Sequence, residues 1–408
     1  MHDPFDVDSQ PSYAKRSGVP IVRSLVPNYH SPAKSRNLQS IINSKKGEVR
    51  IDIRDHFTSK RYRPGSVVEG TVTINSRERL QSGGISIKLV CDSGVETWHH
   101  SLSLETWHRP LDLDMPIPEH VMTDIQDLLP GRDYTVPFHF VLPENLGSEA
   151  CTHEIHSQET KILHSQPPPS LNGWEREAQV PRGVWLQYGI IAQVLDTNTP
   201  SYTKLASKQT FQFLPRARQQ PALDQRHRYT ASEHVKKHIY SKAKAVVTLS
   251  SDQPQVLVIP TSGTDLPATS VHTDLHFECL DAGVSLPQTC IVSAELKTET
   301  WSNGAPLTDW PHLIGQNDSS SSVRCVAKRV QIELAWEHQN SGKAGGMHHP
   351  SGGRYSSRLE IPIGLLSEEE LVLPTFYSCL VARTYQLRMT VKIGTSTVKL
   401  NFPIQLAT

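Results

Sequence analysis

Apolar and polar residues alternate with a period of two over many short stretches of the chain. In the clearest stretch, Tyr134, Val136, Phe138 and Phe140 fall on one face, with other residues between them on the opposite face. Successive side chains of a strand point to opposite faces, so this pattern predicts a β-strand with one buried side. Pro137 lies within it and favours an edge strand or a bulge, because proline cannot donate to the ladder.

The same alternation recurs in both halves of the sequence. It runs through 49–53, 68–74, 85–91, 134–142, 186–194 and 211–213 in the first half, and through 271–279, 290–296, 330–336, 359–363 and 385–402 in the second. Helical periodicity is confined to residues 118–129 and 367–372. Many short strands separated by turn residues predict an all-β fold of two tandem immunoglobulin-like antiparallel β-sandwiches with little helix.

Two pairs of segments echo one another across the halves. Residues 85–98 (ISIKLVCDSGVETW) resemble residues 291–301 (IVSAELKTETW), each an alternating run that ends in Glu-Thr-Trp. Later, residues 186–190 (LQYGI) and 385–389 (YQLRM) stand at matching places. This internal similarity indicates two copies of one sandwich topology.

The charge of the chain is unevenly distributed. Over 408 residues, 41 Lys plus Arg balance 41 Asp plus Glu, yet residues 1–46 and 215–246 together carry a surplus of ten positive charges. The first of these basic segments is rich in Pro and Ser and lacks periodicity, which is typical of disorder. The predicted organisation is a disordered basic arm at 1–47, a first sandwich at 48–214 with a long loop at 143–182, a basic linker at 215–239, and a second sandwich at 240–408.

The composition also bears on the compartment. No stretch reaches the roughly 20 consecutive apolar residues of a membrane helix, and residues 1–10 do not resemble a secretory signal. The six cysteines form no Cys-x-x-Cys pair and five of them lie in apolar alternations, which indicates reduced thiols rather than disulfides. We therefore expect a cytoplasmic protein.

The sequence contains few candidate metal-binding or catalytic motifs. The densest group of metal-ligand types is Cys151-x-His153-x-x-His156, but a zinc site needs a fourth ligand and a fixed geometry, and this group falls in the long loop at 143–182. A polar loop is the favoured interpretation. No Gly-x-Ser-x-Gly and no phosphate-binding glycine loop occurs. The sequence thus predicts no catalytic, cofactor-binding or metal residues and a protein that is not an enzyme.

Four segments resemble the arrestin family, in its fungal and alpha-arrestin-like branch. They are 62–74 (YRPGSVVEGTVTI), similar to an opening strand pair; 129–143 (LPGRDYTVPFHFVLP), similar to the most recognisable strand of the arrestin N-domain; 184–194, similar to the strand that follows it; and 377–393, similar to a closing strand of the C-domain. The resemblance covers residues 48–214 well and residues 240–406 more weakly. The resemblance depends on the order and combination of the four segments, since each motif alone is short.

The resemblance implies the arrestin fold and an adaptor that grips cytosolic tails of membrane proteins for trafficking, endocytosis, ubiquitin-dependent sorting or signalling, at the plasma membrane or endosomes. Related adaptors recruit a ubiquitin ligase through Pro-Pro-x-Tyr motifs, and this chain has none, which argues against ligase recruitment. Two alternatives stay open: an enzyme or small-molecule-binding protein on the same scaffold, and a coat-like endosomal sorting subunit with a permanent partner.

Basic residues in and beside the predicted linker are the candidate contact residues. Clustered Lys and Arg attract anionic lipid head groups or phosphorylated and acidic tails, while the competing interpretation is a solubilising linker. Nucleic acid is not an expected partner, because the total charge is zero and no recognition helix is apparent. The candidate residues are Arg216, Arg218, Arg226, Arg228, Lys236, Lys237, Lys242 and Lys244.

Overall fold

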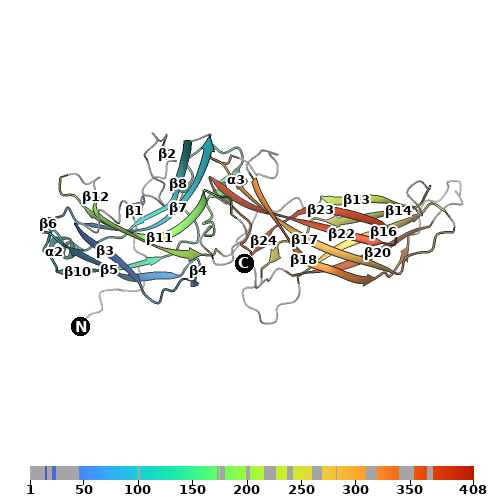
Figure 1. Cartoon of the computed structure of the whole chain (residues 1–408), viewed down its shortest axis with the longest axis horizontal. Helices are drawn as coiled ribbons and strands as arrows, with labels where there is room; N and C mark the ends of the chain where they lie inside the picture. The colour runs from blue at the N-terminus through green and yellow to red at the C-terminus, as the bar shows by residue number, and fades with distance from the viewer. Residues whose placement is uncertain are drawn as a thin grey trace.

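A computed structural model shows two β-sandwiches joined end to end, the first from the N-terminal half and the second from the C-terminal half, with the C-terminus returning to the middle of the molecule (Figure 1). Most of the described residues lie in strands, as predicted. The structure describes residues 14–15, 21–23, 46–99, 102–171, 174, 180–198, 203–215, 227–236, 242–259, 269–281, 283–308, 319–339, 353–364 and 371–408.

The first sandwich packs a three-stranded sheet against a larger one. The three-stranded sheet has the order β10 (Asp133–Val141), β5 (Val67–Ser76), β3 (Gly47–Ile53). The larger sheet has the order β1 (Ala14–Lys15), β8 (Leu102–Asp114), β7 (Ile85–His99), β11 (Val184–Leu195), β12 (Thr203–Phe213), β4 (Arg61–Tyr62), and β2 (Ile21–Arg23) also pairs with β8. A small ladder joins β6 (Leu80–Gln81) to β9 (Asp127–Leu128), beside the short helix α2 (Glu119–Asp124).

The second sandwich is built from two five-stranded sheets. One has the order β13 (Arg228–Lys236), β14 (Ala243–Asp252), β16 (Thr269–Cys279), β20 (Arg354–Ile363), β19 (Glu337–His338). The other contains β18 (Ser319–Glu333), β17 (Thr289–Ser302), β22 (Val381–Ile393) and β23 (Ser396–Ile404), with β21 (Phe376–Tyr377) on the first residues of β22. A short parallel ladder pairs β15 (Leu257–Val258) with β24 (Leu406–Ala407).

The two sandwiches share one strand order. The sheet β8-β7-β11-β12 of the first corresponds to β18-β17-β22-β23 of the second, and β10-β5-β3 corresponds to β20-β16-β14. The segments that echo each other in the sequence are the equivalent strands β7 and β17, and β11 and β22. Equivalent tyrosines make equivalent bonds: the hydroxyl of Tyr188 donates to the carbonyl of Pro168 over 2.8 Å, and that of Tyr385 donates to the carbonyl of Leu373 over 2.6 Å.

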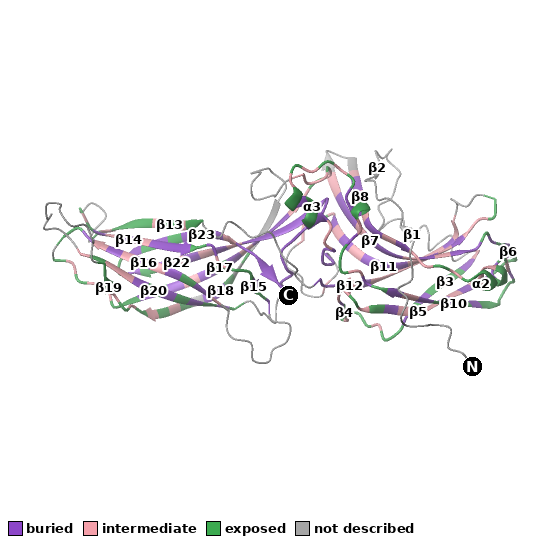
Figure 2. Ribbon diagram, turned by 180° about the vertical axis from the view of Figure 1, so that it is seen from behind, coloured by how far each residue is buried: buried purple, intermediate pink, exposed green. Residues whose placement is uncertain are grey.

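The predicted alternation fills the two cores. Along β10 the buried residues are every second one, and they meet the buried residues of β5 in register, with Val136 opposite Val72 and Phe140 opposite Val68. Pro137 lies on an edge strand as expected, since β10 ends its sheet. Burial alternates in the same way along the strands of both sandwiches (Figure 2). In each sandwich the two sheets bury their apolar faces against one another, and this burial stabilises the packing of the sheets.

Three predicted irregular segments differ from the structure. The predicted linker at 215–239 contains β13, whose alternate residues Tyr229, Ala231 and Val235 pack against the second core; its many basic residues obscured this pattern. Five residues of the predicted disordered arm form β1 and β2, and most of that arm lies outside the described residues. The predicted loop at 143–182 contains a 3-10 turn, η1 (Ser148–Ala150), and helix α3 (Gln158–His164).

The predicted helices fare differently. Within residues 118–129 the structure has the six-residue α2, which has no buried residues, and the two-residue strand β9. Most of the predicted helix at 367–372 lies outside the described residues.

The halves meet at a shared apolar junction. The hairpin of β21 and β22 belongs to the second sandwich, yet Phe376, Leu380 and Val381 are buried in the core of the first. Helix α3 covers this hairpin through Leu163, which packs with Tyr377 and Ala382 in a small separate cluster. Because β22 continues from the junction into the second core, one strand links both cores.

Candidate metal centre

Two cysteines and two histidines come together at this junction. Cys151 follows η1, His153 follows two residues later, and His164 ends α3, so three of them belong to the segment before β11. Cys379 lies in the turn between β21 and β22, in the other half of the molecule. Their potential ligand atoms all lie within 4.8 Å of one another, and no other group of this kind occurs among the residues that the structure describes.

The distances within this group suit a tetrahedral ion. Cys151 Sγ lies 3.1 Å from Nε2 of His153 and 3.4 Å from Nδ1 of His164. Zinc bonds of about 2.3 Å to sulfur and 2.0 Å to nitrogen, arranged tetrahedrally, place neighbouring sulfur and nitrogen ligands about 3.5 Å apart. Shifts of a few tenths of an ångström would bring these two contacts to the spacing of zinc ligands, and the other ligand atoms lie within 4.8 Å.

Local structure fixes each ligand. Ser157 caps α3 by accepting a hydrogen bond from the backbone N–H of Thr160 over 3.1 Å, which fixes where the helix begins. The turn that carries Cys379 is held by the Leu307 N–H, which donates to the Cys379 carbonyl over 2.7 Å. The thiol of Cys379 also donates weakly to the Ala150 carbonyl, 3.8 Å away.

One histidine has a defined outer partner. Nδ1 of His153 lies 3.0 Å from the carbonyl oxygen of Glu154, and a carbonyl can only accept. In the neutral ring Nδ1 therefore carries the proton and Nε2 directs its lone pair toward Cys151. Metal-bound histidines typically have such a second hydrogen bond, because it fixes the tautomer and the ring orientation.

The electrostatics of the group favour a thiolate. Hydrogen bonds with Cys379, His153 and His164 outweigh burial and lower the pKa of the Cys151 thiol to about 3. The same contact with Cys151, together with burial, raises the pKa of Cys379 well above its usual range. The hydrogen bond to Cys151 raises the pKa of His153. A thiolate is the form in which cysteine binds metals.

The sequence indicated only part of this group. The motif Cys151-x-His153-x-x-His156 contains two of the four ligands, but His156 is exposed and does not belong to the group. His164 and Cys379 replace it, and they are 2% exposed. The expectation of a polar loop is wrong for Cys151, which is buried, whereas His153 is half-buried and His156 is exposed. A separation of half the chain hides Cys379 from any local motif.

The remaining cysteines fit the expectation of reduced thiols. All six are free in the structure, and Cys91, Cys279 and Cys290 are buried in the two cores. Cys325 alone is exposed. Burial raises the pKa of Cys290 to about 11, so that thiol stays protonated at neutral pH.

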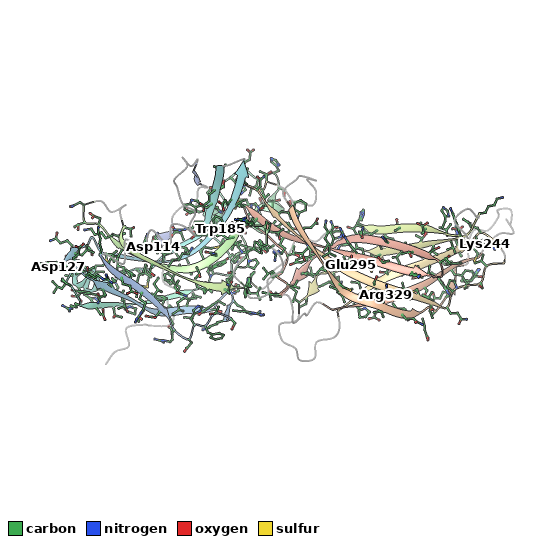
Figure 3. The ribbon with its side chains drawn as sticks, viewed as in Figure 1. Asp114, Asp127, Trp185, Lys244, Glu295 and Arg329 are labelled. Carbon is green, nitrogen blue, oxygen red and sulfur yellow. The ribbon has the colours of Figure 1, made fainter. Side chains whose placement is uncertain are left out.

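The predicted basic contact residues are not gathered in one place. Arg216, Arg218, Arg226 and Lys237 lie outside the described residues. Arg228, at the first residue of β13, is paired with Asp274 over 2.7 Å. Lys236 lies at the other end of β13, in register with Ala243, so Lys242 and Lys244 are its neighbours. Lys244 marks the far tip of the second sandwich (Figure 3).

A ladder of ion pairs crosses the large sheet of the first sandwich. Asp92 lies in a bulge of β7, where the register with β8 shifts, and it accepts from Arg109 and from Lys208 at 2.7 Å each. Lys88 pairs with Asp112 and Asp114 beside it. Burial alone would raise the pKa of Asp92, but the charges of Lys208 and Arg109 and their hydrogen bonds outweigh burial and lower it.

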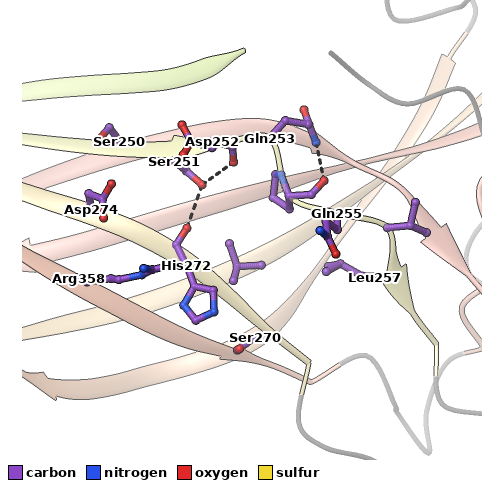
Figure 4. A pocket seen from close by; sticks show the side chains of 13 residues that line it. Ser250, Ser251, Asp252, Gln253, Gln255, Leu257, Ser270, His272, Asp274 and Arg358 are labelled. Carbon is purple, nitrogen blue, oxygen red and sulfur yellow. Dashed lines mark hydrogen bonds between the residues drawn. The ribbon is translucent and has the colours of Figure 1, made fainter. Parts of the chain in front are cut away.

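The second sandwich has an open pocket of about 590 Å³ where Ser, His and Asp residues gather (Figure 4). They do not form a catalytic triad. The hydroxyl of Ser251 donates to the carbonyls of Asp252 and His272, at 3.0 and 3.1 Å, rather than to the imidazole of His272. Asp274 is paired with Arg228. A nucleophile activated by a base needs the hydroxyl–imidazole contact that this pocket lacks.

Comparison with known proteins gave no match to any protein-family model and none to any curated sequence. The resemblance to the arrestin family therefore rests on the sequence segments 62–74, 129–143, 184–194 and 377–393. Within the described part of the chain, no helix is long and apolar enough to cross a membrane.

Proposed function

We propose that this chain is a non-enzymatic, arrestin-like adaptor that binds cytosolic segments of membrane proteins for trafficking, endocytosis or signalling. The observation that carries the proposal is the architecture: two sandwiches of one strand order are joined through a shared core into one long body (Figure 1). Such a body offers two related sheet surfaces in a fixed relation, which suits recognition of a partner by surface complementarity. The resemblance of four sequence segments to arrestins supports it.

The pocket of the second sandwich bears on the enzyme alternative. There the Ser251 hydroxyl donates to backbone carbonyls and Asp274 is paired with Arg228, and in the first sandwich Asp92 is paired with Arg109 and Lys208. In these arrangements the polar groups stabilise the sheets and do not form a nucleophile–base pair. They therefore favour the adaptor over the enzyme. A coat-like subunit would have the same fold and differs in having a permanent partner.

Proximity labelling with the full chain in its native cell tests the adaptor. We expect integral membrane proteins to be labelled on their cytosolic segments, and synthetic peptides of those segments to bind the purified chain reversibly. A salt-resistant complex of constant stoichiometry would instead establish the coat-like subunit. Labelling without any membrane protein, together with turnover of a metabolite that copurifies with the chain, would overturn the adaptor in favour of the enzyme.

The tip formed by Lys236, Lys242 and Lys244 is proposed to contact anionic lipids. All three residues are exposed and lie beside one another where the last residue of β13 pairs with the first residue of β14. At about 1 kcal/mol for each charge near an anionic surface, replacing the three with Glu is expected to weaken binding to phosphatidylserine vesicles by about 100-fold or more. Co-sedimentation with vesicles measures this.

A matched control has the same change in net charge on the first sandwich. Arg50, Arg54 and Arg79 are exposed, and each is paired with an exposed carboxylate. Their replacement by Glu should reduce vesicle binding far less than the change at the Lys236 tip. Equal losses for the two triple variants would show that only the net charge matters, and unchanged binding of the tip variant would exclude a lipid contact there.

A further inference from the structure

The four ligands of the candidate metal centre come from the segments that precede two equivalent strands, one in each sandwich. Cys151, His153 and His164 lie in the segment that leads into β11, and Cys379 lies in the segment that leads into β22. Since β11 and β22 are equivalent strands, the group forms where the two repeats contact each other. A bond network here would join the halves directly, in addition to the apolar contacts of Leu380 and Val381.

Packing alone does not account for this group. Two thiols and an imidazole are all less than a tenth exposed, and each directs a donor atom toward the same small space. A disulfide between Cys151 and Cys379 would account for the two sulfurs, but it would not explain why the two histidine nitrogens converge on the same space. One tetrahedral ion uses all four atoms.

We propose that Cys151, His153, His164 and Cys379 bind one Zn²⁺ and that this ion clasps the two sandwiches together. The ligand atoms are the two Sγ atoms, Nε2 of His153 and Nδ1 of His164. Two sulfurs and two nitrogens in a tetrahedron are the donor set of structural zinc sites. Four protein ligands leave no open position for water, so the ion has a structural role.

The clasp should act on the junction more than on either core. Cys379 is held in its turn by the second sandwich, through the Leu307 N–H, while the other three ligands belong to the first. Zinc binding therefore lowers the free energy of the state in which both segments are in contact. The clasp goes beyond the adaptor proposal and does not depend on it, because a protein with any function could use one.

Metal analysis of the purified full chain is the first test. We expect about one zinc ion per chain after dialysis, and Co²⁺ substitution should give the intense visible absorption of a tetrahedral thiolate site. Cys379→Ser and His164→Ala should each lose the zinc and the cobalt spectrum. Removal of zinc by a strong chelator should speed hydrogen exchange in α3 and in the turn at residues 378–380, and added zinc should reverse this.

Two matched variants show whether the zinc is held by these four residues in particular. His156→Ala removes the histidine of the linear motif and should keep the zinc, whereas His164→Ala should not. Cys325→Ser removes an exposed thiol outside the group and should also keep it. If either ligand variant does not fold, the chelator and zinc-return experiment on the unchanged chain decides the matter alone.

Three results would overturn the proposal. The first is a chain that binds no zinc in slight excess. The second is zinc that stays bound at about one ion per chain after Cys379→Ser and after His164→Ala. The third is a Cys151–Cys379 disulfide in non-reducing peptide mapping of the protein as purified under reducing conditions. Each leaves the adaptor proposal untouched.

Discussion

Replacing Leu380 with Ala is expected to destabilise the first sandwich by about 2–5 kcal/mol, although the residue belongs to the second. Leu380 is fully buried in the first core, where it enters from the turn between β21 and β22. Its truncation removes apolar contacts and leaves a cavity at the junction. Urea unfolding followed by hydrogen exchange in each half measures the effect, since a two-domain chain need not unfold in one step.

Leu387→Ala is the matched control for this prediction. Leu387 is also fully buried and lies further along β22, but it belongs to the second core. We expect a loss of similar size that is confined to the second sandwich. If Leu380→Ala left the unfolding of the first sandwich unchanged, the result would contradict a junction in which Leu380 stabilises the first core.

Replacing Asp92 with Ala is expected to cost about 2–4 kcal/mol at pH 7, because Arg109 and Lys208 would lose the carboxylate that both contact. The side chain of Asp92 is 15% exposed and those of its two partners are 25% exposed, so solvent compensates part of the loss. Asp114→Ala is the control. Lys88 keeps Asp112 when Asp114 is removed, so the cost should stay below about 1 kcal/mol.

The contribution of Asp92 to the free energy of unfolding should decrease as the pH falls. Its pKa is lowered in the folded protein, so its contribution is fully present above the unfolded pKa of about 3.9 and is lost as the pH falls through the lower folded value. The difference in the free energy of unfolding between the unchanged protein and Asp92→Ala should therefore shrink below about pH 4. A difference that grew on acidification would contradict the ion-pair interpretation.

The strands could be predicted because their signal is local. In β10 and β11 alternate residues face one core, so a period of two in the sequence reports burial directly. The repeat could also be predicted, because β7 and β17 both have Glu-Thr-Trp near their C-terminal ends and hold equivalent positions. The failure at β13 has a physical reason: a strand at the edge of a sheet with one partly buried face needs few apolar residues.

The candidate metal centre could not be predicted for a different reason. His164 is positioned by α3, a helix too short to show a clear period, and Cys379 is positioned by a hairpin in the other repeat. Their meeting depends on how the two sandwiches are joined, which no local pattern encodes. The observable hint was Cys151-x-His153, since two ligand types so close together already constrain a site.

A junction held by Leu380 in one core and by four metal ligands beside it would keep the two sandwiches in one relation. For an adaptor this matters, because a partner that spans both sandwiches is bound more tightly when their relation is set beforehand. Removal of the zinc should then weaken the binding of partners that contact both sandwiches more than the binding of partners that contact only one.

X-ray absorption at the zinc edge of the full chain tests most directly whether the fold brings these two segments together around an ion. The structure predicts two sulfur neighbours at about 2.3 Å and two nitrogen neighbours at about 2.0 Å, with one sulfur lost in Cys379→Ser if any zinc remains bound. A zinc shell of nitrogen and oxygen only, or one unchanged by Cys379→Ser, would contradict the clasp.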